Sequence, residues 1–361
     1  MKVLIAPDSF KGTATAVEVA AALAEGWLSV RGGDDVSLMP QADGGEGTLD
    51  AIATSGSWHR RLTEVAGPDG RPVHARWLLD DNGRTVVELA ESSGIALMPH
   101  LDPWHASTHG LGEVIAAALS AGARSVQIGL GGSASTDGGL GVLTALGLRA
   151  VDRVGQPVVG GAAGLRDVAR VDASALAKLP PGGVELLVDT HAPLYGPRGA
   201  PAVFGPQKGA DADDIDELDA VLRQWAAVLR DAGLTADPDQ PGAGAAGGVG
   251  FGLLAWGATT TSGSARIAAL TGLDHRLPSA DVVVTGEGRF DRTSLTGKLV
   301  GSVLDASARA GVPAFVVAGQ VGDACPVPAI SLTDLAGSSP AAVADPLRWL
   351  RVAGALAAQG F

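Results

Sequence analysis

Short apolar runs in this sequence are followed repeatedly by a glycine-rich loop and then by a segment with helical apolar periodicity. The first such run is Val3–Ala6, and the periodic segment after its loop opens with Thr15 and Glu18. These two residues have the spacing of a capping box, in which each side chain bonds the other residue's backbone N–H at a helix start. Comparable runs lie at Val36–Met39, Thr85–Leu89, Ser125–Ile128, Glu185–Val188, Val282–Thr285 and Val312–Ala318. Strands that alternate with helices predict an α/β protein with mostly parallel sheets.

Composition limits the kind of partner that the chain can bind. Its 361 residues suffice for about two domains with a buried core. The net charge of −13 would repel nucleic acids and anionic membranes, and aromatic residues, at 4%, are too few for base stacking. The one cysteine, Cys325, excludes an intrachain disulfide, and the sequence shows neither a signal peptide nor a run of ~18 apolar residues. We therefore expect a cytoplasmic protein that acts on a small molecule.

Five glycine-rich loops carry most of the residues suited to chemistry. They are residues 6–12, 41–48, 129–139, 204–210 and 285–298. In open parallel sheets, ligands bind beyond the carboxyl ends of the strands, where such loops lie. Lysine is rare among the 26 basic residues, yet Lys11, Lys208 and Lys298 each stand beside a glycine in one of these loops. A compact ammonium group can lie over a phosphate or a carboxylate, so the loops predict a site for an anion.

Acidic residues stand in or beside the same strand ends. They are Asp8, Asp43, Glu46, Asp189, Glu287 and Asp291. Mg²⁺ binds carboxylates together with phosphate oxygens, and phosphoryl transfer needs an acidic group that orients or deprotonates the attacking hydroxyl. Consecutive N–H groups in the stretch Ile128–Gly139 would form a cradle for phosphate at a helix start. The alternative for each acid is a helix N-cap, above all for Asp137.

Two further segments have local interpretations. The acidic run Asp211–Asp219 is expected to begin an amphipathic helix that reaches Leu229, where the helix dipole favours negative charge. Residues 237–250 are rich in glycine and alanine and run into an apolar segment. They form either a linker or the start of a helix that packs very closely against a neighbour.

The order and wording of these loops resemble the bacterial glycerate kinase family of the type that phosphorylates the 2-hydroxyl (glycerate 2-kinase, glycerate kinase type 1). The resemblance rests on KVLIAPDSFKG, ADGGEGT, GGSASTDGG, GPQKGA, PGAGAAGGVG, VVTGEGRFD and TGK, within residues 1–320. It implies a Rossmann-like domain made of residues 1–60 and 278–361. A flavodoxin-like α/β domain, residues 61–277, would be inserted between them, with the active site in the cleft between the two domains. The strands at Val3–Ala6, Val36–Met39, Val282–Thr285 and Val312–Ala318 would then share one sheet.

The resemblance also implies a reaction and a set of site residues. The enzyme would phosphorylate D-glycerate with ATP in the presence of Mg²⁺, giving 2-phosphoglycerate and ADP. The catalytic residues would be Asp43, Lys11, Lys208 and Asp189, with Asp43 orienting the attacking hydroxyl and the lysines neutralising carboxylate or phosphates. The substrate-binding residues would be Asp8, Ser9, Lys11, Glu46, Ser133 and Arg289. The ATP-binding residues would be Gly131, Gly132, Ser133, Asp137, Gly286, Gly288 and Lys298, and the metal ligands Asp189, Glu287 and Asp291.

Three positions depart from the family's pattern. Asparagine is common where Thr136 and Ala192 stand, and proline is usual where this chain has Val300. Two alternatives therefore stay open, a catalytically impaired relative that senses a sugar acid or a nucleotide, and a kinase for another small hydroxy acid. The sequence leaves open the position of transfer and the oligomeric state, a homodimer being one option.

Overall fold

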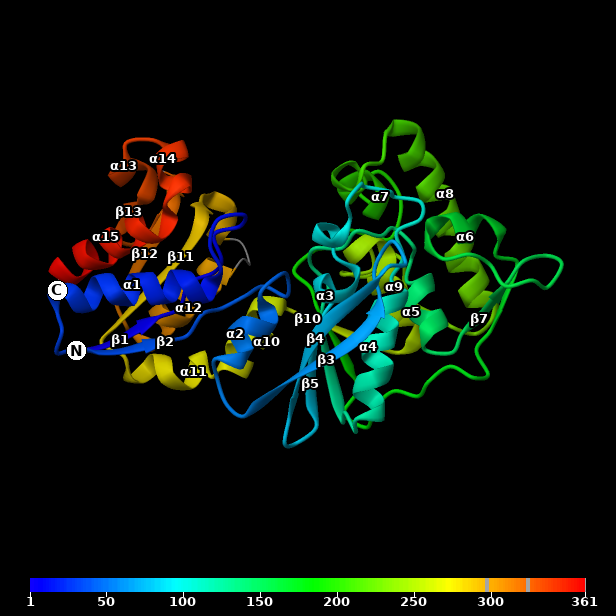
Figure 1. Ribbon diagram of the computed structural model, residues 1–361, viewed down its shortest axis with the longest axis horizontal. Helices are drawn as coiled ribbons and strands as arrows, with labels where there is room; N and C mark the ends of the chain where they lie inside the picture. Colours follow the sequence, from blue (N-terminus) through cyan, green and yellow to red (C-terminus); the bar gives the residue numbers. More distant parts are fainter. Residues whose placement is uncertain (296–298, 323–324, 361) are drawn as a thin grey trace. The chain divides into compact units, whose positions relative to one another are not determined.

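The computed structural model describes residues 1–295, 299–322 and 325–360. Its contacts divide the chain into two compact units (Figure 1). Unit 1 consists of Met1–Asp43, Asp50–Gly56 and Gly263–Phe361, and unit 2 of Gly44–Leu49 and Ser57–Ser262. The family resemblance assigned residues 263–277 to the inserted domain, but they belong to unit 1. It assigned residues 44–49 and 57–60 to the Rossmann-like domain, but they belong to unit 2.

Unit 1 is built on a parallel sheet of five strands in the order β13-β12-β11-β1-β2. The strands are β1 (Lys2–Ile5), β2 (Asp35–Leu38), β11 (Val282–Phe290), β12 (Ala314–Val321) and β13 (Ala329–Ser331). Four of them are the apolar runs that the sequence placed in one sheet, so that prediction is confirmed.

Helices cover both faces of this sheet. Val3 and Ile5 of β1 pack in one apolar core with α1 and α15, whereas Leu4 packs in a second core with α11 and α12. Successive side chains of a strand point to opposite faces, which makes unit 1 a three-layer α/β structure. Its helices are α1 (Ala16–Val30), α10 (Gly263–Thr271), α11 (Leu273–Arg276), α12 (Leu299–Ala310), α13 (Leu332–Ala336), α14 (Ser339–Ala344) and α15 (Pro346–Gln359). Helix α2 (Thr48–Ala53) begins in unit 2 with Thr48 and Leu49 and continues in unit 1 from Asp50.

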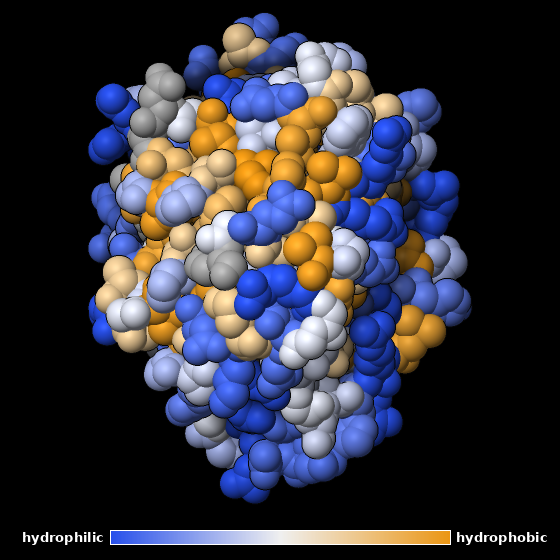
Figure 2. Space-filling model, turned by 90° about the vertical axis from the view of Figure 1, so that its left-hand side faces the viewer, coloured by the Kyte–Doolittle hydropathy of each residue, from blue (hydrophilic) through white to orange (hydrophobic). Residues whose placement is uncertain are grey.

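Helix α1 shows how local sequence and packing agree. Thr15 and Glu18 form both bonds of the predicted capping box. The helix also packs along α15, where a Cβ on Gly26 would lie 2.0 Å from the carbonyl oxygen of Arg351. Glycine is therefore required at position 26. Figure 2 looks onto unit 1, where apolar groups gather between hydrophilic areas. The exposed apolar side chains of unit 1 include Leu28 of α1 and Leu356 of α15.

Unit 2 is built on a mixed sheet of six strands in the order β10-β9-β6-β5-β4-β3. The strands are β3 (Trp58–Ala66), β4 (Pro72–Asp80), β5 (Arg84–Glu88), β6 (Ser125–Gly129), β9 (Val184–Leu187) and β10 (Thr259–Thr261). From β5 to β10 the neighbours are parallel, as predicted, but β3 and β4 form an antiparallel hairpin that the sequence analysis did not predict. A separate two-stranded sheet pairs β7 (Arg149–Val151) with β8 (Arg170–Asp172).

The helices of unit 2 are α3 (Ala90–Ser93), α4 (His109–Ser120), α5 (Leu140–Ala145), α6 (Gly161–Asp167), α7 (Ala200–Phe204), α8 (Ala212–Asp231) and α9 (Ala245–Trp256). The acidic run opens α8, as predicted, with Asp211 and Asp214 forming a capping box. None of the helices in the described part of the chain has the length and apolar character needed to cross a bilayer.

The glycine-rich segment that runs into the first turns of α9 packs closely and is not a linker. Ala246, Gly247 and Gly248 all have left-handed backbone angles, with φ of 54°, 69° and 88°. A Cβ on Gly250 would lie 2.0 Å from the carbonyl oxygen of Gly242, and one on Gly252 would lie 2.6 Å from that of Gly138. Small residues are therefore required where α9 meets its neighbours.

Candidate active site

Charged side chains gather in unit 1 where its parallel strands end. Asp8 and Lys11 lie in the loop after β1, Asp43 follows β2, and Glu287 lies in the C-terminal half of β11. The Asp8 N–H donates to the carbonyl oxygen of Gly286 at 2.8 Å, which ties the first loop to β11. The Lys11 Nζ lies 3.8 Å from Oδ2 of Asp43. The structure thus brings together, within unit 1, three acids and a lysine that the sequence singled out.

Asp8 has the most perturbed electrostatics of this group. Burial and then the negative charge of Asp43 raise the pKa of Asp8 to about 7, with a smaller contribution from Glu287. The Ser9 N–H, 2.6 Å from Oδ1 of Asp8, and the Lys11 ammonium group act in the opposite direction. A carboxyl that titrates near neutral pH can both accept and release a proton there, as a general base must. The sequence predicted Asp8 only as a substrate-binding residue, because burial cannot be seen in a motif.

The end of β11 holds the remaining unit 1 candidates. Arg289 is exposed, with its Nε 3.8 Å from Oδ2 of Asp291. Oδ1 of Asp291 accepts hydrogen bonds from the N–H and the hydroxyl of Thr293. A Cβ on Gly286 would lie 1.9 Å from the carbonyl oxygen of Val317, so the sheet itself requires glycine there.

The predicted roles of Lys298 and of the three metal ligands are not matched by a local cluster of side chains in the described residues. Lys298 lies outside the described residues. Of the predicted metal ligands, Glu287 and Asp291 belong to unit 1 and Asp189 to unit 2. Across residues 1–295, 299–322 and 325–360, no group of three or more His, Cys, Asp or Glu side chains is arranged to hold a metal ion.

In unit 2, the glycine-rich loop after β6 packs against the segment Gly44–Leu49. The Gly131 N–H donates to the carbonyl oxygen of Gly44 at 3.1 Å, and a Cβ on Gly131 would lie 2.4 Å from the Cα of Gly45. A Cβ on Gly129 would lie 2.6 Å from the same carbonyl oxygen. Part of the glycine content that the sequence ascribed to phosphate binding is thus explained by contact between two backbones. The assignment of Gly131 and Gly132 to ATP stays a prediction.

Asp137, in the same loop, is fully buried and accepts four hydrogen bonds. Its Oδ2 accepts from the N–H and hydroxyl of Thr108 at 2.9 and 2.7 Å and from the Gly141 N–H at 3.2 Å, and its Oδ1 accepts from the Gly139 N–H at 3.1 Å. Burial raises the pKa of Asp137, and these four bonds lower it. The carboxylate thus joins the starts of α4 and α5, although the N-cap positions of these helices are Thr108 and Gly139 and not Asp137 itself.

Lys208 extends beneath this loop from the turn after α7. Its side chain is 2% exposed, and Nζ donates to the carbonyl oxygen of Ser135 and lies 3.5 Å from Oγ of Ser133. Burial lowers the pKa of Lys208 to about 7, and the negative charge of Asp137 acts against this shift. The structure therefore joins two loops that the sequence identified separately.

Asp189, after β9, accepts a hydrogen bond at 3.1 Å from the hydroxyl of Ser262.

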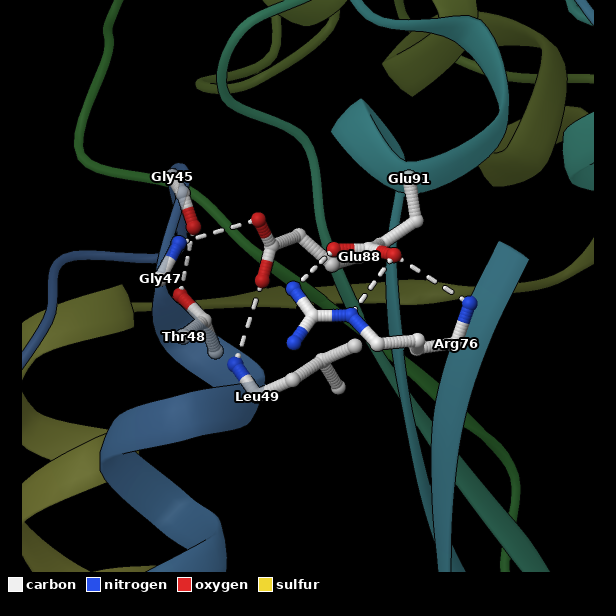
Figure 3. A network of polar contacts seen from close by, with 7 residues as sticks. All are labelled: Gly45, Gly47, Thr48, Leu49, Arg76, Glu88 and Glu91. Carbon is white, nitrogen blue, oxygen red and sulfur yellow. Dashed lines mark hydrogen bonds and ion pairs between the residues drawn. The ribbon is translucent and has the colours of Figure 1, made fainter. Parts of the chain in front are cut away.

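Glu88, at the end of β5, is a buried acid that the sequence analysis did not identify. Figure 3 shows its carboxylate pointing at the start of α2, where Oε1 accepts from the Gly47 N–H at 3.0 Å and Oε2 from the Leu49 N–H at 3.1 Å. Burial raises the pKa of Glu88 to about 7, against the effect of these two N–H groups. The neighbouring Arg76 and Glu91 form an ion pair of their own. No motif marks position 88, because it completes an apolar strand.

Glu88 holds the segment that carries Glu46. A Cβ on Gly132 would lie 3.0 Å from Oε1 of Glu46, so the Glu46 side chain lies against the loop after β6. The structure thus brings Glu46 close to the predicted ATP-binding glycines, within unit 2.

The raised pKa of Glu88 predicts a pH-dependent contribution to stability. An acid whose pKa is higher in the folded than in the unfolded state destabilises the fold as pH rises from the unfolded value to the folded one. From its ordinary value of 4.5 to about 7, we expect Glu88 to lower the free energy of unfolding by up to about 3 kcal/mol. Urea denaturation at pH 5 and pH 8 should show that Glu88→Gln removes this loss, whereas the exposed control Glu217→Gln should keep it. An equal pH dependence in wild type and Glu88→Gln would contradict the assignment.

Known proteins that resemble this chain identify its family. A family model described as "Glycerate kinase family" matches residues 3–352. The chain is 42% identical over 330 residues to the glycerate kinase of Bacillus subtilis (strain 168), which covers 89% of this chain and 85% of that protein. It is 38% identical over 328 residues to the glycerate 2-kinase of Escherichia coli (strain K12), covering 90% and 86%.

A solved structure extends the similarity to the whole fold. A crystal structure described as glycerate kinase 2 from Salmonella typhimurium LT2 superposes with a TM-score of 0.85 at 34% identity, covering 100% of this chain and 98% of that one. The α/β fold predicted from the sequence is confirmed. From the family model, the relatives and the fold together, the chain belongs to the glycerate kinase family.

Proposed function

We propose that this protein transfers the γ-phosphoryl group of ATP to the 2-hydroxyl of D-glycerate, giving 2-phosphoglycerate and ADP. The observation that carries the proposal is the unit 1 cluster in which Asp8, with a pKa of about 7, lies beside the Lys11–Asp43 ion pair. A hydroxyl becomes a nucleophile for phosphoryl transfer when an acidic group orients it and takes its proton. Membership of the glycerate kinase family supplies the substrate class.

Within unit 1 the proposed roles follow from charge and geometry. Asp43 orients the attacking hydroxyl, and Asp8 accepts its proton, because Asp8 is the acid that titrates near neutral pH. Lys11 is 79% exposed at its side chain, so its ammonium group can reach the carboxylate of glycerate or a phosphate. Ser9 and Arg289 are proposed as further contacts of the substrate.

Mg²⁺ is part of the proposal, as the companion of ATP. Carboxylate oxygens are the ligands that Mg²⁺ prefers, and the carboxylates proposed for it are those of Glu287, Asp291 and Asp189. When bound with the phosphates, the ion neutralises charge on the transferred group. Asp291 is oriented by Thr293, whose N–H and hydroxyl both donate to its Oδ1.

For unit 2, the contacts favour a positioning role for Lys208. Its Nζ is buried and donates to the Ser135 carbonyl, so we propose that it acts through the loop that carries Ser133 and not by contact with a phosphate. Ser133, Gly131 and Gly132 remain the proposed contacts of ATP. A homodimer is proposed as the assembly.

The function is tested by incubating the purified chain with Mg-ATP and D-glycerate and identifying the product by ³¹P NMR. We expect 2-phosphoglycerate and one ADP for each acceptor consumed, and Asp43→Asn should abolish turnover while leaving the fold intact. Comparing kcat/KM over a panel of small hydroxy acids separates glycerate from another acceptor. Binding of D-glycerate without any phosphorylated product would instead support the sensor alternative raised by Thr136 and Ala192.

A further inference from the structure

Strand β3 forms one edge of the six-stranded sheet of unit 2, because β4 is its neighbour on one side only (Figure 1). It is nine residues long and pairs with β4 along its whole length, from Trp58 opposite Asp80 to Ala66 opposite Pro72. A long edge strand presents backbone donors and acceptors on which another strand can form.

The hydrogen bonds at the end of β3 show which residues face this edge. Gly67 donates its N–H to the carbonyl oxygen of Arg71 at 2.7 Å, so position 67 bonds toward β4. At the next position back, the Ala66 N–H points the other way and donates to Oε2 of Glu113 at 2.7 Å. Residues of an antiparallel pair alternate in this manner.

The alternation fixes the outward positions of the strand. Arg60, Leu62 and Glu64 have the parity of Ala66 and direct their N–H and C=O groups away from β4. Their side chains share one face of the sheet, since they are two residues apart. Leu62 is 63% exposed, and the Glu64 side chain is 68% exposed.

We propose that β3 pairs antiparallel with β3 of a second copy of this chain, with Leu62 opposite Leu62. In that register, Arg60 of each copy lies directly opposite Glu64 of the other. Opposite charges and apolar side chains directly across an antiparallel pair stabilise it. The two exposed leucines cover each other on the two-fold axis, and the two sheets join into one.

The charges on β3 favour a second copy of the same strand as its pairing partner, and they favour the register centred on Leu62. Charged residues on an edge strand ordinarily prevent pairing, but here their order is self-complementary about Leu62. Pairing centred on Arg60 or on Glu64 would instead place two like charges opposite each other. A symmetric interface in which the same strand serves both copies is the common arrangement of a dimer.

Cysteine cross-linking tests the register directly. Directly opposed, hydrogen-bonded residues have Cα atoms about 5.5 Å apart, within the range of a disulfide. Under mild oxidation Leu62→Cys should form a disulfide-linked dimer that is visible on a non-reducing gel. A reductant should convert this dimer to the monomer. The control Arg60→Cys should not, because its symmetry mate would lie roughly 13 Å away, and the parent chain controls for Cys325. Equal cross-linking of both variants, or of neither, overturns the proposal.

Charge reversal tests the interface in solution. Sedimentation of the full chain over a dilution series should show a dimer whose Kd rises on the order of tenfold in Glu64→Arg or Arg60→Glu. The double variant Arg60→Glu with Glu64→Arg should return the Kd to the wild-type range, and the exposed control Arg153→Glu should leave it unchanged. Unchanged thermal midpoints show that the variants fold. A chain that is monomeric at every concentration, or a double variant that stays dissociated, overturns the proposal.

Discussion

Replacing Asp8 with asparagine should lower kcat with D-glycerate by about 10²- to 10⁴-fold, the range that a positioned general base contributes. Wild-type kcat/KM should rise with pH and level off above about 7, since Asp8 accepts the proton only when it is ionised. Asp8→Asn should lose this rise of kcat/KM with pH, which is the acidic limb of the pH profile. In Asp43→Asn any residual activity should show the limb at lower pH, because the neighbouring negative charge that raises the Asp8 pKa is gone.

The control for this prediction is Asp35→Asn, which removes an exposed carboxylate from β2 in the same unit. It should keep both kcat and the pH profile. Wild-type rates and an unchanged pH limb in Asp8→Asn would show that another group takes the proton, and the proposed role would then pass to Asp43.

Replacing Asp137 with alanine should lower the free energy of unfolding by about 3–5 kcal/mol, because it leaves four buried donors without their acceptor. Chemical denaturation followed by tryptophan fluorescence measures this, since Trp225 donates to the carbonyl oxygen of the adjacent Gly138. ATP affinity should fall only in proportion to the folded fraction if Asp137 is structural.

Asp152→Ala is the matched control for Asp137→Ala. Asp152 also accepts two backbone N–H groups, from Val154 and Gln156, but in an exposed turn where water can replace it. Its loss should cost about 1 kcal/mol or less. A stable Asp137→Ala protein that no longer binds ATP would favour the cofactor role and contradict the structural one.

Four of the five strands of unit 1 could be predicted from the sequence because they are continuous apolar runs, which are typical of parallel strands. The short strand β13 was not predicted. The capping box at Thr15 could be predicted because it is complete within four residues. The start of α8 was predicted from its acidic residues, and its capping box at Asp211 was found only in the structure. The hairpin of β3 and β4 escaped prediction because β3 is mostly exposed and carries charge at several positions.

At the candidate site, motifs located the residues but not their surroundings. The sequence identified Asp8, yet its shifted pKa comes from burial and from Asp43, which lies far along the chain. Gly131 was ascribed to phosphate binding, although it also meets Gly45, a contact that only folding reveals. Glu88 belongs to no motif and could be recognised only from the hydrogen bonds that its carboxylate accepts from two backbone N–H groups.

The assignment of Gly44–Leu49 to unit 2, between two stretches of unit 1, limits how this protein can be dissected. A fragment made of residues 57–262 would lack the segment Gly44–Leu49. In the intact fold this segment donates two N–H groups to the Glu88 carboxylate and accepts a hydrogen bond from the Gly131 N–H. In such an excised piece the Glu88 carboxylate and the loop after β6 would lose their backbone partners, and the piece should fold poorly unless that hexapeptide is added back or grafted onto its new N-terminus.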